Sequence, residues 1–81
     1  MIHADHILAG PTCDTCGREA RLRRNRDDSD NYDWVTSSDG GQSYSWWCMD
    51  VVGYLRHICT VGNWGCVTKA FADAHPELVV L

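Results

Sequence analysis

The chain has 81 residues, five cysteines and a net charge of −4, and these values exclude several classes of protein. So short a chain forms one domain, 1–81, whose apolar core supplies only about 3–5 kcal/mol, so a disulfide or metal cross-link is expected. The acidic balance argues against a general polyanion-binding protein, and the sequence has no apolar run near the roughly 20 residues of a membrane-spanning helix.

The first recognisable element is a knuckle, the run CDTCG at 13–17. The spacing of Cys13 and Cys16 lets both thiolates reach one tetrahedral ion, and Gly17 permits the tight turn around it. Because the number of cysteines is odd and no secretory leader precedes them, we expect a reducing compartment, the cytoplasm, or the host cytoplasm for a viral protein. In such a compartment closely spaced cysteines are more often metal ligands or catalytic groups than disulfides.

The middle of the chain, about 18–47, predicts an antiparallel sheet. The stretch REARLRRN at 18–25 fits a strand. Because its arginines occupy both faces, at least one face must be exposed to solvent or contact a partner. RDDSDN after it is typical of a loop. Asp39 and Gly40 lie between two stretches rich in Thr, Tyr, Trp and Ser. This pattern favours a tight hairpin with strands near 32–38 and 42–47.

Two helices are expected after the sheet. Apolar residues recur at helical spacing up to residue 59 and predict a helix over about 49–59. Its start stays open, because the same apolar stripe extends back to Tyr44. A second helix is expected over about 64–74, with Asn63 as its N-cap and Pro76 as its stop. The apolar ending ELVVL either docks on the core or offers a strand to a partner's sheet edge.

This order of elements, a CDTCG knuckle, strands, an Asp-Gly hairpin and then Cys48 near a helix start, resembles zinc-ribbon and treble-clef domains. The resemblance covers residues 13 to about 60, and only the knuckle is specific. Together with the elements predicted above, it gives an α+β fold: a small zinc-knuckle domain with a two- to three-stranded antiparallel sheet, two C-terminal helices and one structural zinc ion. The chain departs from the pattern at residue 51, which is Val where a second cysteine pair requires Cys.

The expected metal ligands are Cys13, Cys16, Cys48 and Cys66. Cys66 lies three residues after Asn63, where the N–H groups of a helix start favour a thiolate. Cys48 and Cys59 are alternatives, because a continuous helix would hold them roughly 16 Å apart. The weaker substitutes are His57, His75, His3 and His6.

A site closed by four protein ligands leaves no position for a substrate, so we expect a structural metal and no enzyme. A thioredoxin-like centre would need an α/β unit after the cysteine pair. Covalent haem would need His at residue 17, which is Gly. Small nucleases with a histidine-centred finger place Asp-His after the knuckle, whereas Asp5-His6 precedes it here. A calcium loop would need Gly where Asp33 stands.

The favoured function is a protein-interaction module, such as a phage or bacterial accessory protein that regulates or inhibits a larger complex. The residues expected to contact the partner are Trp34, Trp46, Trp64, Arg21, Arg23 and Arg24. The first alternative is a nucleic-acid-binding zinc module, because five of the seven basic residues lie within Arg18–Arg26. The second alternative is a structural component of a large assembly such as a virion.

Overall fold

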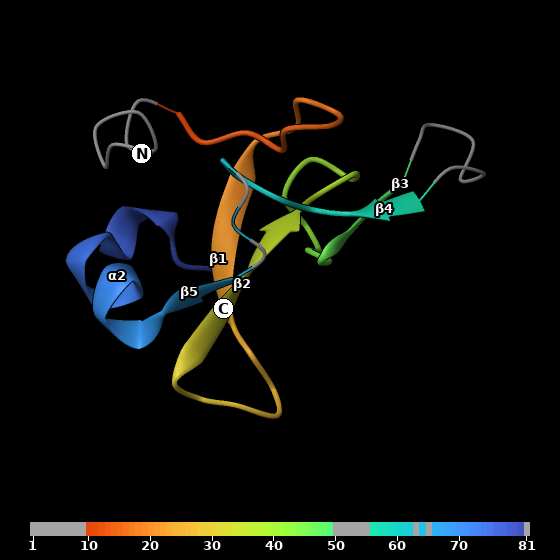
Figure 1. Cartoon of the computed structure of the whole chain (residues 1–81). Helices are drawn as coiled ribbons and strands as arrows, with labels where there is room; N and C mark the ends of the chain where they lie inside the picture. Colours follow the sequence, from red (N-terminus) through yellow and green to blue (C-terminus); the bar gives the residue numbers. More distant parts are fainter. Residues whose placement is uncertain (1–9, 50–55, 63, 65, 81) are drawn as a thin grey trace.

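The computed structural model describes residues 10–49, 56–62, 64 and 66–80. Its elements are β1 (Ala20–Arg24), β2 (Asn31–Thr36), β3 (Trp47–Met49), β4 (Arg56–Ile58), β5 (Cys66–Thr68), α2 (Lys69–Ala74) and the 3-10 helix η1 (Pro76–Leu78). Within the described residues the strands form a three-stranded antiparallel sheet, β1-β2-β5, and a two-stranded one, β3-β4 (Figure 1). The expected antiparallel sheet is present. The same residues contain a single α-helix and one 3-10 turn, where two helices were expected.

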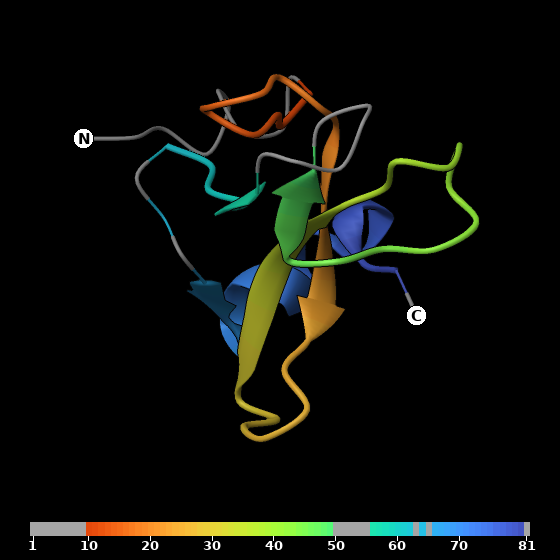
Figure 2. The same cartoon turned by 90° about the vertical axis from the view of Figure 1, so that its right-hand side faces the viewer.

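β1 is the strand expected from the arginine-rich stretch. Ala20 and Leu22 are buried, whereas Arg21 and Arg23 are half-buried on the opposite face, which is the two-residue period of a strand. The loop after it is also as expected. The Asn25 side chain accepts hydrogen bonds from the next backbone N–H groups and orders this turn. The turn lies at the opposite end of the sheet from the knuckle (Figure 1, Figure 2).

Trp34 lies in the core between the three-stranded sheet and α2. Its side chain is fully buried and meets the Phe71 ring edge-on, with ring centroids 6.4 Å apart. Trp34 therefore belongs to the core and not to the contact surface expected for it. Trp64 is half-buried and also packs edge-on against Phe71, with ring centroids 5.3 Å apart. The other core residues are Cys13, Ala20, Leu22, Tyr32, Cys48, Cys59, Val61, Val67, Ala72 and Leu78.

The helix predicted over 49–59 is wrong at both of its described ends. β3 and β4 pair antiparallel there, with Trp47 opposite Ile58, and residues 50–55 lie outside the described part of the chain. A short apolar run fits a helix and a buried strand equally well, so periodicity alone cannot separate them. The pairing of β3 with β4 is what distinguishes the two here.

Around Asp39 the chain turns back as predicted, but the turn is not tight and the strand expected near 42–47 is wrong, because β3 begins only at Trp47 and pairs with β4. Thr36 and Ser45 form a bridge in which each N–H donates to the other's carbonyl, at 2.8 and 2.9 Å. Residues 37–44 between them form a loop that projects from the sheet (Figure 2). The Asp39 carboxylate orders this loop by accepting hydrogen bonds from the hydroxyls of Ser37 and Ser43 and from backbone N–H groups. Asp39 thus acts as the acceptor at the centre of a long loop.

The second predicted helix begins five residues later than expected, at Lys69. Residues 66–68 instead form β5 against β2, with Val67 buried and its two neighbours exposed. The N-cap is Thr68, whose hydroxyl oxygen accepts from the Phe71 N–H at 3.3 Å. Asn63, the cap predicted from the sequence, lies outside the described residues. α2 ends before Pro76, as expected.

The apolar C-terminal stretch docks on the chain's own core, which was one of the two expected outcomes. Leu78 is buried, Val79 bridges to Leu22 in parallel, and the Val80 N–H donates to the Leu22 carbonyl at 2.8 Å. These residues occupy part of the outer edge of β1. In the part of the chain that the structure describes, no helix is long and apolar enough to cross a membrane.

Candidate metal centre

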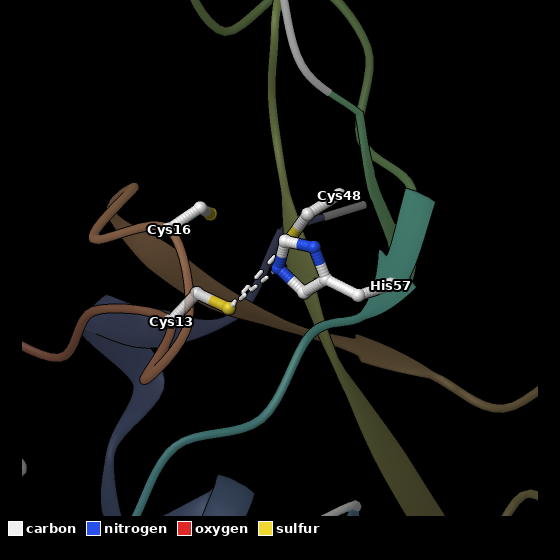
Figure 3. Close-up of side chains that lie close together, drawn as sticks. All are labelled: Cys13, Cys16, Cys48 and His57. Atoms are coloured by element: carbon white, nitrogen blue, oxygen red, sulfur yellow. Dashed lines mark hydrogen bonds between the residues drawn. The ribbon is translucent and has the colours of Figure 1, made fainter. Parts of the chain in front are cut away.

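The knuckle is a closed loop held by backbone hydrogen bonds. Thr12 and Glu19 form an antiparallel bridge at its base. The Gly17 N–H donates to the Cys13 carbonyl at 2.9 Å, and Gly17 has a φ of +75°, a left-handed conformation that side chains rarely adopt. The expectation for Gly17 is confirmed. The turn brings Cys13 and Cys16 to the same side of the loop (Figure 3).

The β3-β4 hairpin supplies two further donors. Cys48 and His57 are directly opposite one another in its register. Residues opposite one another on antiparallel strands project from the same face, with their Cβ atoms about 4.5–5.5 Å apart. Their neighbours Trp47 and Ile58 form the next opposed pair and project from the other face. One face of the hairpin therefore carries the thiol and the imidazole, and the other carries Trp47 and Ile58 beside Arg56.

The knuckle and the hairpin bring four donor atoms together. The Sγ atoms of Cys13, Cys16 and Cys48 and a ring nitrogen of His57 all lie within 4.8 Å of one another (Figure 3). The Sγ atom of Cys13 is 3.4 Å from Nε2 of His57 and 3.7 Å from Sγ of Cys48. The Asp14 N–H also donates to the Thr60 carbonyl at 2.9 Å, which fastens the knuckle to the chain just after β4.

These distances fit a tetrahedral zinc ion. With Zn–S near 2.3 Å and Zn–N near 2.0–2.1 Å, two sulfurs on one zinc are about 3.8 Å apart, and a sulfur and a nitrogen about 3.5 Å. The measured separations of 3.7 and 3.4 Å are close to these values. The widest separation, at most 4.8 Å, has to close by only about 1 Å. Three cysteines and one histidine are also a known ligand set of structural zinc.

The thiols of the group differ in acidity. Burial raises the pKa of the Cys13 thiol, but hydrogen bonds from the backbone of Cys16, Thr60 and Thr15 and from His57 outweigh it and bring the pKa down to about 6. Burial raises the pKa of Cys48 to about 11, against a hydrogen bond from Thr36 that lowers it. Cys13 is therefore the more acidic of the two thiols. A cation beside Cys48 would favour the loss of its proton.

Cys59 lies next to this group without being one of its four members. It is fully buried, and burial together with the nearby thiols of Cys48 and Cys13 raises its pKa. The expectation that Cys48 and Cys59 lie roughly 16 Å apart fails, because it assumed one continuous helix. β3 and β4 pair side by side instead, and this pairing brings Cys59, which directly follows β4, back toward Cys48.

Cys66, expected among the ligands, lies outside the group. It stands on β5 opposite Asp33 and is exposed. His57, considered only a substitute, takes the fourth position of the cluster. His75 packs on the Phe71 ring, with centroids 4.5 Å apart, also outside the group. His3 and His6 lie outside the described residues.

A sequence signal for His57 existed. Gly53 lies between Cys48 and His57 in the sequence, and an isolated glycine inside a helical pattern weakens the case for a continuous helix. Without a continuous helix, Cys48 and His57 can face one another, as they do in the β3-β4 register.

The sequence matches no protein-family model, and no curated protein or solved structure matches the chain. The resemblance of its knuckle to those of zinc-ribbon and treble-clef domains therefore stays a prediction. In the structure the third and fourth donors, Cys48 and His57, lie on two paired strands. A treble clef would instead place its remaining ligands in the first turn of a helix.

Trp47 and Ile58 on the other face of the hairpin, together with Trp46 just before β3, form an exposed apolar surface, which we call the tryptophan face. Their exposed fractions are 41%, 38% and 48%, and the two indole rings contact each other with centroids 4.8 Å apart. Of the expected contact residues, Trp46 is thus exposed. Trp47 and Ile58 were missed because they were assigned to the apolar stripe of a helix.

The three arginines expected at the contact surface lie on β1. Arg21 pairs with Glu19 at 3.4 Å and donates to its neighbour's carbonyl. Arg23 donates to the Tyr44 carbonyl at 2.8 Å. Arg24 is exposed, and its guanidinium lies 5.9 Å from the centre of the Tyr32 ring.

Proposed function

We propose that this protein is a small interaction module whose fold is stabilised by one structural zinc ion, and that it binds a protein partner. The zinc ligands are Cys13, Cys16, Cys48 and His57. The observation that carries the proposal is the two-sidedness of the β3-β4 hairpin. One face carries two of the four converging donors, and the other carries exposed apolar side chains.

The donor set supports a structural role for the metal. Four protein ligands complete a tetrahedron, so no position remains for a substrate or a water molecule. Cys13 and Cys48 are also buried, with exposed fractions of 2% and 0%. An ion between them ties the knuckle to a hairpin some 35 residues away in the chain, and its binding free energy contributes to folding.

The tryptophan face supports the interaction role. Trp47 and Ile58 are exposed on the short β3-β4 strand pair, and Trp46, which directly precedes β3, is exposed beside them. Tryptophan is enriched at the centres of protein interfaces, where its large rigid ring is buried at a low cost in conformational entropy. The metal on the opposite face would hold the hairpin in place before the partner arrives, which lowers the cost of binding. Such a module suits an accessory protein that regulates or inhibits a larger complex.

Site-specific photocrosslinking tests the interaction role. A benzoylphenylalanine residue replaces Ile58, and in a matched control it replaces Ala70, which is exposed on α2. After irradiation in the protein's own cells, the Ile58 variant is expected to form a discrete adduct of higher mass that the Ala70 variant does not form. A smear of equal intensity from both positions, or no adduct from position 58, would show that the tryptophan face has no protein partner.

A further inference from the structure

A groove of about 800 Å³ lies beside the tryptophan face, and Trp46 belongs to both. The end of β1 and the turn after it form the other wall, which carries Arg23, Arg24 and Arg26. The residues that line the groove are Arg23, Arg24, Asn25, Arg26, Asp27, Ser29, Asp33 and Trp46. Because the rings of Trp46 and Trp47 are in contact, the groove and the tryptophan face form one continuous surface.

Most of the guanidinium N–H groups in this groove have no hydrogen-bond partner among the described residues. Among the described residues, Arg23, Arg24 and Arg26 form no ion pair with a carboxylate, although the chain as a whole is acidic. Arg23 and Arg24 use single N–H groups, toward a backbone carbonyl and a tyrosine hydroxyl. A guanidinium has five N–H donors, so most of those on each arginine remain available to a ligand.

Two of the aspartates close by are engaged in ordering the turn. The Asp28 carboxylate accepts from the Asp30 N–H and from the Asn31 side chain, at 3.1 and 2.6 Å. The Asp33 carboxylate accepts from the Asn25 amide at 3.2 and 3.3 Å. The carboxylates of Asp28 and Asp33 therefore hold the turn in place. The arginines of the groove remain available to an anion from outside the chain.

We infer that the partner of this module presents an acidic segment containing apolar side chains, with its carboxylates in the groove and its apolar side chains on the tryptophan face. The inference rests on the proposed function and names the chemistry of the partner. Carboxylates pair with guanidinium groups through two parallel hydrogen bonds, a geometry that adds specificity as well as affinity. The mixture of arginine and tryptophan on one continuous surface is typical of interface centres.

An acidic protein segment fits this surface better than a nucleic acid does. Asp27 and Asp33 line the same groove as the three arginines. An evenly charged phosphate backbone would meet both aspartates, whereas separate carboxylates on a peptide match the arginines and avoid the aspartates. The net charge of −4 also opposes a polyanion approaching from solution.

Selection from a library of displayed random 12-residue peptides tests the inference without a known partner. The zinc-loaded protein is the bait, in three forms: the native chain, the double variant Arg24→Glu/Arg26→Glu, and the control Arg21→Glu. Arg24 and Arg26 are exposed, so their reversal should leave the fold intact, which the melting temperature and the zinc content verify. Arg21 is paired with Glu19 and does not line the groove.

The native chain is expected to enrich peptides that combine net negative charge with apolar residues. The best of them should bind the double variant on the order of tenfold more weakly and Arg21→Glu about as tightly as the native chain. Enriched apolar peptides without excess acid, or equal affinity for the native chain and the double variant, would overturn the inference while the crosslink at position 58 still supports the proposed function.

A second probe, a 20-nucleotide oligothymidylate, tests whether the groove binds a nucleic acid instead. If it binds the native chain with an affinity that falls steeply with salt, and no peptide is enriched, the groove is a nucleic-acid site and the inference is wrong. If neither probe binds, the inference is also wrong. In that last case a crosslink at position 58 would still report a partner that uses the tryptophan face without the groove.

Discussion

Removing zinc should cost this protein a large part of its stability, and exchanging the exposed cysteine Cys16 for serine should have nearly the same effect. Cys13 and Cys48 are 35 residues apart in the chain. A cross-link that closes a loop of this length lowers the entropy of the unfolded chain by an amount worth about 4 kcal/mol. A domain of 81 residues has a total unfolding free energy of about 4–12 kcal/mol. The ion therefore contributes between about a third and all of the stability.

Thermal unfolding followed by circular dichroism measures this contribution. For a domain of this size 1 kcal/mol shifts the melting temperature by about 4–8 °C, so a strong chelator should lower it by about 15–30 °C. Native mass spectrometry on the same samples should show one zinc ion before chelation and none after it. The two measurements together separate a bound structural ion from an incidental one.

The chain offers a matched control for the ligand substitution. Cys16 and Cys66 are both exposed, so replacing either thiol with a hydroxyl creates no cavity in the core. Cys16→Ser should lose zinc and melt near the temperature of the chelated protein, whereas Cys66→Ser should keep both its zinc and its melting temperature. If Cys66→Ser lost the ion, the ligand set expected from the sequence would be right and the one from the geometry wrong. A zinc-bound protein whose melting temperature does not respond to chelation would refute the reasoning altogether.

Three further predictions concern the fold, each measured on the zinc-loaded protein. Trp34→Ala should lower the unfolding free energy in urea by about 3–5 kcal/mol because it empties a fully buried site, whereas Trp46→Ala should change it by no more than about 0.5 kcal/mol; equal losses would contradict the burial of Trp34. Thr68→Ala should cost about 0.5–2 kcal/mol, since its hydroxyl caps α2, and an unchanged urea midpoint would show that this cap does not form. Hydrogen bonds from two serine hydroxyls lower the pKa of Asp39, so its carboxylate stabilises the loop above the unfolded value of about 3.9 and the stabilisation is lost as the pH falls below it. A carboxyl 13C titration by NMR should place the Asp39 midpoint below 3.9, and a midpoint at or above that value would refute it.

The local features of this chain could be predicted from the sequence alone. The knuckle at 13–17, the strand in the arginine-rich stretch, the acidic turn after it and the helix stop at Pro76 all depend on residues close together in the chain. A two-residue cysteine spacing, alternation along a strand and the fixed φ of proline act over a few bonds, so these features depend little on distant contacts.

The fourth donor of the metal site depends on tertiary structure. Whether Cys48 meets Cys66 or His57 depends on which strands pair, and the apolar stripe through 44–59 suits a helix as well as two strands. The hairpin register places His57 opposite Cys48 and turns Trp47 and Ile58 outward. Pairing β5 with β2 leaves Cys66 exposed on a strand of the other sheet. Residue periodicity sets which side chains share a face, whereas long-range strand pairing decides which faces meet, and that choice is a property of the folded chain as a whole.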